Sequence, residues 1–75
     1  MKKVSKNEFI NEIKVGDLVE VIKAYRKLDG NVFEVLELRG DHIRILEYII
    51  HKADITKIYK KRIDGDYELY EVTND

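Results

Sequence analysis

The sequence predicts a mainly β protein, a small barrel of about five antiparallel strands preceded by a short helix, and three observations lead to this fold class. At 75 residues and 8.9 kDa the chain has room for one hydrophobic core. Its β-branched residues gather in short runs, and all four glycines stand beside an aspartate. Glycine and aspartate both favour turns, so these pairs divide the chain into pieces of strand length.

Composition places the chain among compact, non-fibrous domains. Hydrophobic residues make up 44% of the sequence, which is too apolar for a disordered tail, and the net charge of -1 gives no bulk-basic signature of a nucleic-acid binder. Without cysteine there is no disulfide framework and no thiolate chemistry, which favours the cytoplasm. We expect a single domain over residues 1–75, divided into a helix at 5–14, a barrel at 15–60, and a C-terminal strand with an acidic tail at 61–75.

The first element is a helix with a recognisable beginning. Ser5 and Glu8 have the spacing of a capping box, in which each side chain bonds the other residue's backbone N–H. Phe9, Ile10 and Ile13 then form one narrow apolar stripe. A helix this short is marginal alone, so we expect the stripe to dock on the rest of the domain.

Four runs rich in valine, isoleucine or tyrosine predict strands, at residues 18–24, 32–38, 43–50 and 67–72. Their alternation of apolar and polar residues is imperfect, which predicts that some strands are covered on both faces, as in a closed barrel. The Arg39–His42 turn is short enough to join antiparallel neighbours, and the turn at residues 64–66 introduces the last strand.

Two segments leave the choice of element open. Asp17 and Glu20 also have capping-box spacing, and the apolar residues of 18–28 follow a helical period that ends near Gly30. We favour a strand there, because β-branched residues at 19, 21 and 22 disfavour a helix. Residues 53–61 are also ambiguous, with Asp54 placed to cap a single turn that bridges the last two strands.

The order of residues resembles the SH3-like small barrels, in particular the KOW-type domains of transcription elongation factors and ribosomal proteins. The stretch from Gly16 to Val21 looks like the opening Gly-Asp-x-Val-x-Val strand, Gly30-Asn31-Val32 with Val35 resembles the second strand, and residues 50–58 resemble the closing strand and turn. The resemblance covers about residues 15–60 and implies a five-stranded barrel that binds a macromolecular partner.

A second resemblance is to the Sm-like RNA-binding barrels, in which a helix precedes five strands. Asp29-Gly30 and Asp41 stand at a spacing similar to landmark residues of the bacterial members, and residues 50–55 look like their Tyr-Lys-His-Ala-Ile stretch, with His51 and Lys52 in swapped order. This resemblance implies RNA contacts at His51 and Lys52.

The chain offers little for catalysis. Its only serine is the expected helix cap, and His42 and His51 have no neighbouring nucleophile or metal-ligand pattern. The glycines are too far apart to cradle a phosphate. We therefore expect no enzyme, no metal and no cofactor.

Charges and tyrosines indicate where a partner binds. Residues 51–62 hold five Lys or Arg against Asp54, while residues 64–75 hold five acids and no base. Tyr25, Arg26 and Lys27 lie in the longest loop, where an aromatic among cations is a common interface element. The candidate partner-binding residues are Tyr25, Arg26, Lys27, His51, Lys52, Tyr59, Lys60, Lys61 and Arg62.

Each of these features has an ordinary structural alternative. The basic segment at 51–62 and the acidic segment that follows can lie antiparallel and neutralise each other across two strands. A tyrosine can cap the end of a barrel instead of binding a partner. Tyr67 and Tyr70 lie on opposite faces of the last strand, so at most one of them points inward.

The function predicted from these features is a non-catalytic protein-binding or regulatory module with no membrane segment. By analogy with its fold class it acts as an accessory factor of transcription or translation, or as a regulator from a mobile element or phage. Ten lysines against four arginines are typical of AT-rich bacterial or phage genomes. The alternative is RNA or DNA binding by an Sm-like or KOW-like domain. The oligomeric state is left open.

Overall fold

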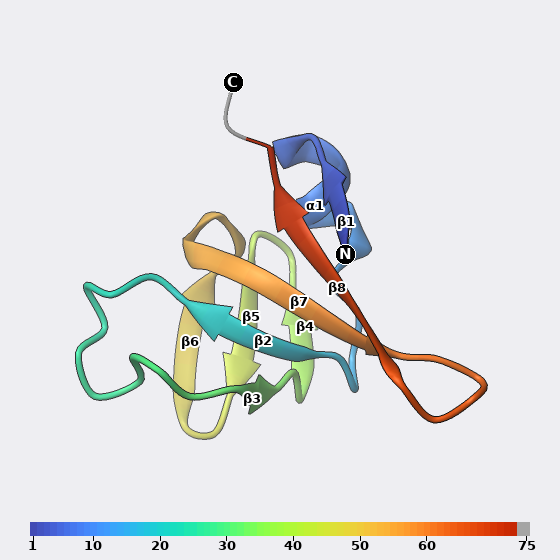
Figure 1. Cartoon of the computed structure of the whole chain (residues 1–75). Helices are drawn as coiled ribbons and strands as arrows, with labels where there is room; N and C mark the ends of the chain where they lie inside the picture. The colour runs from blue at the N-terminus through green and yellow to red at the C-terminus, as the bar shows by residue number, and fades with distance from the viewer. Residues whose placement is uncertain (74–75) are drawn as a thin grey trace.

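The computed structural model describes residues 1–73, which form two β-sheets and one short helix (Figure 1). A five-stranded sheet has the order β1-β8-β7-β2-β3, and a three-stranded sheet has the order β4-β5-β6. The elements are β1 (Lys2–Val4), α1 (Lys6–Glu12), β2 (Leu18–Val21), β3 (Phe33–Glu34), β4 (Glu37–Arg39), β5 (His42–Ile45), β6 (Tyr48–His51), a 3-10 turn (Lys52–Asp54), β7 (Ile55–Lys61) and β8 (Tyr67–Val72).

The mainly β class with a short N-terminal helix is confirmed, but the closed barrel of about five antiparallel strands is not found. Both sheets are open in the described part of the chain, and β1 lies parallel to β8. β1 is absent from the sequence-based prediction because Lys2-Lys3-Val4 carries one apolar residue and no alternation. Its pairing with the other end of the chain is a long-range contact that local pattern does not encode.

Helix α1 begins at the predicted Ser5 cap, and of the two capping-box bonds only the one to Ser5 is found within residues 1–73. The Ser5 Oγ accepts the Glu8 backbone N–H at 3.2 Å, and the Phe9 N–H donates to the Ser5 carbonyl at 2.8 Å. The helix ends at Glu12, two residues earlier than expected, because Ile13 is already extended. Phe9 and Ile13 are both buried, so the helix docks by the predicted stripe.

The segment that could be either helix or strand contains a strand. In β2, Leu18 pairs with Tyr59 of β7 and with Glu34 of β3, while Val19 and Val21 are buried on the inner face. The helical alternative is wrong, since residues 23–30 form successive turns. The sheet contact on both sides of β2 decides this, in agreement with its β-branched residues.

Two of the predicted strands are each divided in two. Residues 32–38 form β3 and β4, which belong to different sheets, because the chain changes sheets at Val35 and Leu36. Residues 43–50 form the hairpin of β5 and β6, in which Leu46 adopts a φ of 49° in a two-residue turn. A leucine with positive φ is uncommon. The sequence has none of the usual turn residues at this point, so it did not predict the hairpin turn.

The connection from β6 to β7 is the single turn expected near Asp54, with a different cap. His51 Nδ1 accepts the Ala53 N–H at 3.0 Å and caps the 3-10 turn, whereas Asp54 is its last residue. β7 and β8 then form a long antiparallel hairpin around the predicted turn, where Gly65 has a φ of 93°. A residue with a side chain would be strained at that φ.

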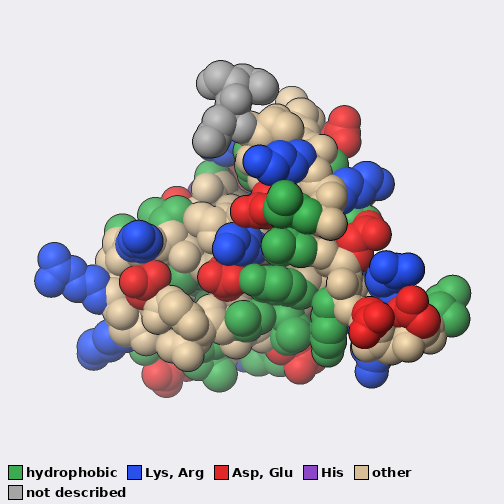
Figure 2. Space-filling model, viewed as in Figure 1, with side chains coloured by type: hydrophobic (Ala, Val, Ile, Leu, Met, Phe, Trp, Pro, Cys, Tyr) green, Lys and Arg blue, Asp and Glu red, His purple; other side chains and the backbone are tan. Residues whose placement is uncertain are grey.

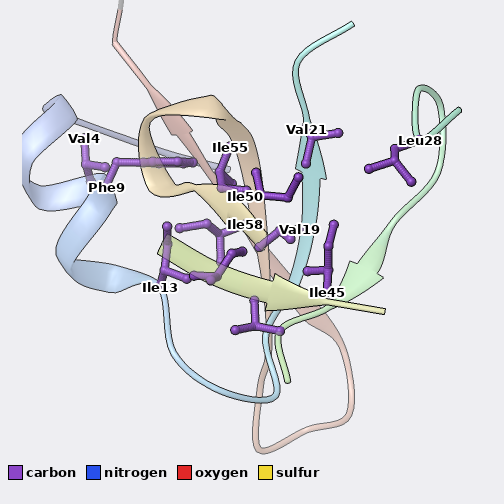
Figure 3. Packing of buried hydrophobic residues seen from close by; sticks show 12 residues of the cluster. Val4, Phe9, Ile13, Val19, Val21, Leu28, Ile45, Ile50, Ile55 and Ile58 are labelled. Carbon is purple, nitrogen blue, oxygen red and sulfur yellow. The ribbon is translucent and has the colours of Figure 1, made fainter. Parts of the chain in front are cut away.

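The core lies between the two sheets and against α1 (Figure 3). No polar or charged side chain is buried within residues 1–73, and each buried isoleucine contributes about 1.5–3 kcal/mol by leaving water. None of the helices in this part of the chain has the length and apolar character to cross a membrane. The buried residues are Val4, Phe9, Ile13, Val19, Val21, Leu28, Val35, Ile43, Ile45, Ile50, Ile55 and Ile58.

Candidate functional site

The loop between β2 and β3 is ordered by its own backbone and by one buried side chain. Three successive turn bonds run from Tyr25 to Ile22 (3.2 Å), from Leu28 to Tyr25 (2.8 Å) and from Asn31 to Leu28 (3.3 Å). Leu28 is 5% exposed and lies at the edge of the core cluster, on this loop (Figure 3). The loop therefore has a defined shape in the unbound protein.

Two bonds to Asp54 tie the same loop to the 3-10 turn. The Ile22 N–H donates to the Asp54 carbonyl at 2.9 Å, and the Tyr25 hydroxyl donates to Asp54 Oδ2 at 2.7 Å. The hydrogen bond to the carboxylate raises the pKa of Tyr25, because it favours the protonated phenol. The Tyr25 hydroxyl thus has a hydrogen-bond partner within the protein, while the side chain also contributes to the surface hollow described next.

Next to this loop the surface has a hollow of about 300 Å³. Its wall is mostly apolar, and it includes Tyr48, at the start of β6, which has a relative exposure of 36%. The predicted residues Tyr25, Arg26 and Lys27 all line it. We call this feature the loop hollow, and its lining residues are Ala24, Tyr25, Arg26, Lys27, Leu28 and Tyr48.

The sequence-based prediction missed Leu28 and Tyr48 as members of the loop hollow. Leu28 looked like a core residue of a helical alternative, and Tyr48 lies 20 positions further along the chain, in the hairpin that the sequence did not reveal. No local pattern connects a tyrosine of β6 to a loop after β2. The only signal in the sequence for this role was the number of tyrosines, because a side chain with an apolar ring and a polar hydroxyl is often half-buried at the surface.

The predicted basic strip from His51 to Arg62 does not form one surface. The Tyr59 hydroxyl donates to Glu20 Oε2, and Lys60 Nζ lies 2.7 Å from Asp17 Oδ2. The Lys60 and Asp17 side chains are only 22% and 12% exposed. These two contacts link β7 to β2 and its preceding turn, so the polar groups of both candidate residues already have partners within the protein.

Lys57 and Lys60 of β7 are opposite acids on neighbouring strands, whereas Lys61 is opposite Tyr67. Lys57 lies opposite both Glu20 and Glu71, and Lys60 lies opposite Glu68. The antiparallel hairpin of β7 and β8 places the basic and acidic segments side by side, as one of the two predicted alternatives requires, but no ion pair within residues 1–73 joins the two strands. Cross-strand pairs of opposite charge contribute about 0.2–1 kcal/mol each.

The ends of the predicted strip lie at two other places. Lys61 and Arg62 lead into the exposed hairpin tip, where Arg62 Nη2 is 3.3 Å from Asp64 Oδ2. His51 and Lys52 lie at the end of β6, next to the three-stranded sheet. There His51 pairs with His42 across the strands, with ring centroids 4.8 Å apart at 71°.

The outer face of the five-stranded sheet carries a band of apolar side chains. The strand register places Leu18 opposite Tyr59 and Tyr59 opposite Leu69, and Tyr67 follows on the same face of β8. Figure 2 shows hydrophobic side chains gathered over β2, β7 and β8 beside a row of both charge signs. The sequence did not identify this band, because its members come from three strands.

No three His, Cys, Asp or Glu side chains of residues 1–73 converge to hold a metal ion, and the Ser5 hydroxyl caps α1. A second hollow, of about 370 Å³, is polar and is lined by Lys3, Lys6 and Glu71, so it contains charges of both signs. The loop hollow is the better-formed candidate surface.

Comparisons with models of protein families, with curated proteins and with solved structures find no match to this chain. The geometry of the loop hollow and its charges are therefore the basis for assigning a function.

Proposed function

We propose that this protein is a non-catalytic protein-binding module that recognises its partner with the loop hollow. The observation that carries the proposal is the combination of an apolar wall with two cations at its rim. Arg26 and Lys27 line the loop hollow and, like most Lys and Arg of residues 1–73, form no ion pair in that part of the chain. Unpaired cations beside an apolar hollow fit a hydrophobic side chain that has a carboxylate next to it.

Preorganisation supports a role in binding. The turn bonds, the buried Leu28 and the Tyr25–Asp54 hydrogen bond hold the loop before a partner arrives. A loop that is already ordered loses less conformational entropy on binding than a flexible one, so more of the contact free energy appears as affinity. Tyr25 and Tyr48 add rings with few rotatable bonds, which are frequent among the residues that dominate interfaces.

The finer fold assignment that accompanies this proposal is an SH3-like arrangement of the two sheets. Two features support it. Val35 donates to the Asp17 carbonyl at 2.8 Å and Leu36 to the Arg44 carbonyl at 2.9 Å, so one continuous segment joins both sheets. A single 3-10 turn also returns the chain from β6 to β7. With this resemblance we propose an accessory role in transcription or translation, or in a mobile element or phage.

Selection from a library of random peptides displayed on phage tests the proposal with the full chain as bait. We expect the enriched peptides to carry Leu, Ile or Phe beside Asp or Glu. The variant Tyr48→Ala removes one wall of the loop hollow and should weaken binding of the selected peptides at least about tenfold. The matched control Tyr67→Ala removes an exposed tyrosine from the other end of the molecule and should leave binding unchanged.

Failure to enrich peptides above an uncoated surface would contradict the proposal. So would enriched peptides that bind wild type and Tyr48→Ala equally well, because the loop hollow would then not be the contact. Circular dichroism and urea unfolding of both variants establish that any loss of binding does not come from unfolding.

Nucleic-acid binding is the second candidate, and the exposed residues around His51, at the end of β6 in the three-stranded sheet, favour it. His42, His51 and Lys52 put two rings and a cation on one exposed strand end, where bases can stack and a phosphate can bind. The test is fluorescence anisotropy with labelled single-stranded RNA and DNA of mixed sequence. Affinity that falls steeply with salt and is lost in His51→Ala would support this candidate over the protein-binding module.

A further inference from the structure

We propose that the tip of the β7–β8 hairpin of one copy docks into the loop hollow of another copy, so that the protein self-associates head to tail. The inference rests on the proposed function, since it uses the same hollow as the receiving surface. Its second component is Ile63, which stands at the hairpin tip with a relative exposure of 108%.

The hairpin tip presents Ile63 on a defined scaffold. The Arg62 N–H donates to the Asp66 carbonyl at 2.6 Å, the Gly65 N–H to the Arg62 carbonyl at 3.1 Å, and the Asp66 N–H to Asp64 Oδ1 at 3.1 Å. These bonds close the turn without any contribution from the Ile63 side chain. An isoleucine held out in water by an ordered turn is an apolar knob, and its burial is favourable.

A copy cannot fill its own hollow with its own tip. The hairpin tip and the loop after β2 project from opposite ends of the molecule (Figure 1), whose extents are 30 × 30 × 25 Å. A knob at one end and a hollow at the other form a heterologous contact, in which each added copy exposes the same two surfaces again. The expected assemblies are therefore short chains that grow with concentration.

Size and charge both suit this contact. Empty apolar cavities of about 150 Å³ accommodate benzene, so a hollow of about 300 Å³ has room for the side chain of Ile63. At the tip, Arg62 is paired with Asp64, whereas Lys61 and Asp66 form no ion pair within residues 1–73; Lys61 belongs to β7, and Asp66 lies in the turn itself. The Asp66 carboxylate is thus the acid that can approach Arg26 and Lys27 when the tip docks.

Self-docking would also regulate recognition of other partners. A hairpin tip that occupies the loop hollow excludes the hydrophobic-acidic peptide that the proposed function requires there. Peptide binding should therefore weaken as the total protein concentration rises into the range of self-association, and dilution should restore it.

Sedimentation velocity of the full chain across a concentration series up to about 1 mM tests the inference, since a contact this small is expected to be weak. We expect the weight-average mass of wild type to rise with concentration. Ile63→Ser should weaken association at least about tenfold, because losing a buried isoleucine exceeds the ~1.4 kcal/mol that corresponds to a factor of ten. Val15→Ser, at another exposed apolar residue, is the matched control and should associate like wild type.

Charge exchange identifies the two surfaces. Asp66→Lys alone and the double variant Arg26→Glu with Lys27→Glu should each stay monomeric, because tip and hollow then carry the same sign. Mixed in equal amounts, the two variants should associate again. Wild type that stays monomeric at every concentration, or Ile63→Ser that associates as wild type does, would overturn the inference, as would a mixture that stays monomeric when wild type associates.

Peptide selection on Ile63→Ser separates this inference from the proposed function. This variant keeps the loop hollow and lacks the knob. If it still selects peptides that depend on Tyr48 while wild type remains monomeric, the protein-binding module stands and the self-association is wrong. If wild type associates through Ile63 but no peptide is selected, the hollow receives only a second copy.

Discussion

The loop after β2 and the strand β7 are alike in sequence and different in the fold. Each combines tyrosine with cationic residues, Arg26 and Lys27 in the loop and three lysines in β7, and each suggested a partner-binding surface. In β7 the polar groups of Tyr59 and Lys60 contact Glu20 and Asp17, and Lys57 lies opposite two acids. In the loop, Arg26 and Lys27 point to no such partner within residues 1–73.

This difference shows that the same residue types serve opposite purposes according to what lies across from them. An antiparallel ladder brings each side chain within reach of a neighbour, and in β7 this allows Lys60 to form an ion pair with Asp17. A loop at the edge of the fold has neighbours on one side only. Cations at such a place remain available to a partner, and substitutions in the two regions should therefore differ in what they change.

The largest expected effect on the free energy of unfolding is in β7. Ile58→Ala, in the middle of β7, removes a fully buried side chain that lies opposite Val19. The loss of buried surface together with the resulting cavity should lower the free energy of unfolding by about 2–5 kcal/mol. Urea unfolding followed by circular dichroism measures this. A loss below about 1 kcal/mol would mean that β7 is not part of a packed core.

Loss of the Tyr25–Asp54 bond should affect stability and binding together. Tyr25→Phe leaves Asp54 Oδ2 without its donor and should lower the free energy of unfolding by about 1–2 kcal/mol, since the acceptor is charged. Because the same bond fixes the wall of the loop hollow, affinity for selected peptides should fall as well. Urea unfolding and peptide titration on one preparation compare the two effects. Unchanged peptide affinity would show that the bond does not shape the loop hollow.

The pair of Lys60 and Asp17 should matter for stability alone. Lys60→Met keeps the apolar stem and removes the charge that faces the Asp17 carboxylate at 2.7 Å. We expect a loss of about 1 kcal/mol, more than an exposed ion pair gives, because both side chains are partly buried. Exposed Arg62→Met is the comparison and should change stability by less than about 0.5 kcal/mol. Equal effects would show that burial makes no difference here.

Alkaline pH should reveal the bond between Tyr59 and Glu20. The hydrogen bond to the carboxylate raises the pKa of Tyr59 from its ordinary 10.0 to about 12. A raised pKa in the folded protein means that this bond stabilises the fold fully below pH 10, and that the contribution is lost as the pH rises through about 12. The stability difference between wild type and Tyr59→Phe should therefore shrink over that window, as measured by urea unfolding at several pH values.

The smallest expected effect on stability is in the loop. Arg26→Ala with Lys27→Ala should change the free energy of unfolding by less than about 0.5 kcal/mol, because neither side chain has an ion-pair partner among the described residues. The same variant should lose affinity for the acidic peptides. A stability loss as large as that of Lys60→Met would contradict the proposed difference between the loop after β2 and β7.

Local pattern was sufficient where an element depends on its own residues. The Ser5 cap, the buried Phe9 and Ile13, and the hairpin around Gly65 are consequences of side-chain chemistry at short spacing, and they agree with the structure. The loop residues Tyr25 to Lys27 could be selected as a candidate surface on the same ground. Leu46, with its positive φ, shows the limit, because the turn there is held by the pairing of β5 and β6 and not by turn residues.

The pairing of β7 with β2 decided that Lys60 forms an ion pair with Asp17. The sequence specifies strands, turns and the number of charges, since these follow from backbone preference and alternation over a few residues. Lys60 reaches Asp17 across 43 positions only when β7 has paired with β2, and Tyr48 reaches the loop after β2 only when the two sheets have packed together. Such contacts arise from long-range packing, which buries apolar surface and leaves the loop hollow exposed to solvent.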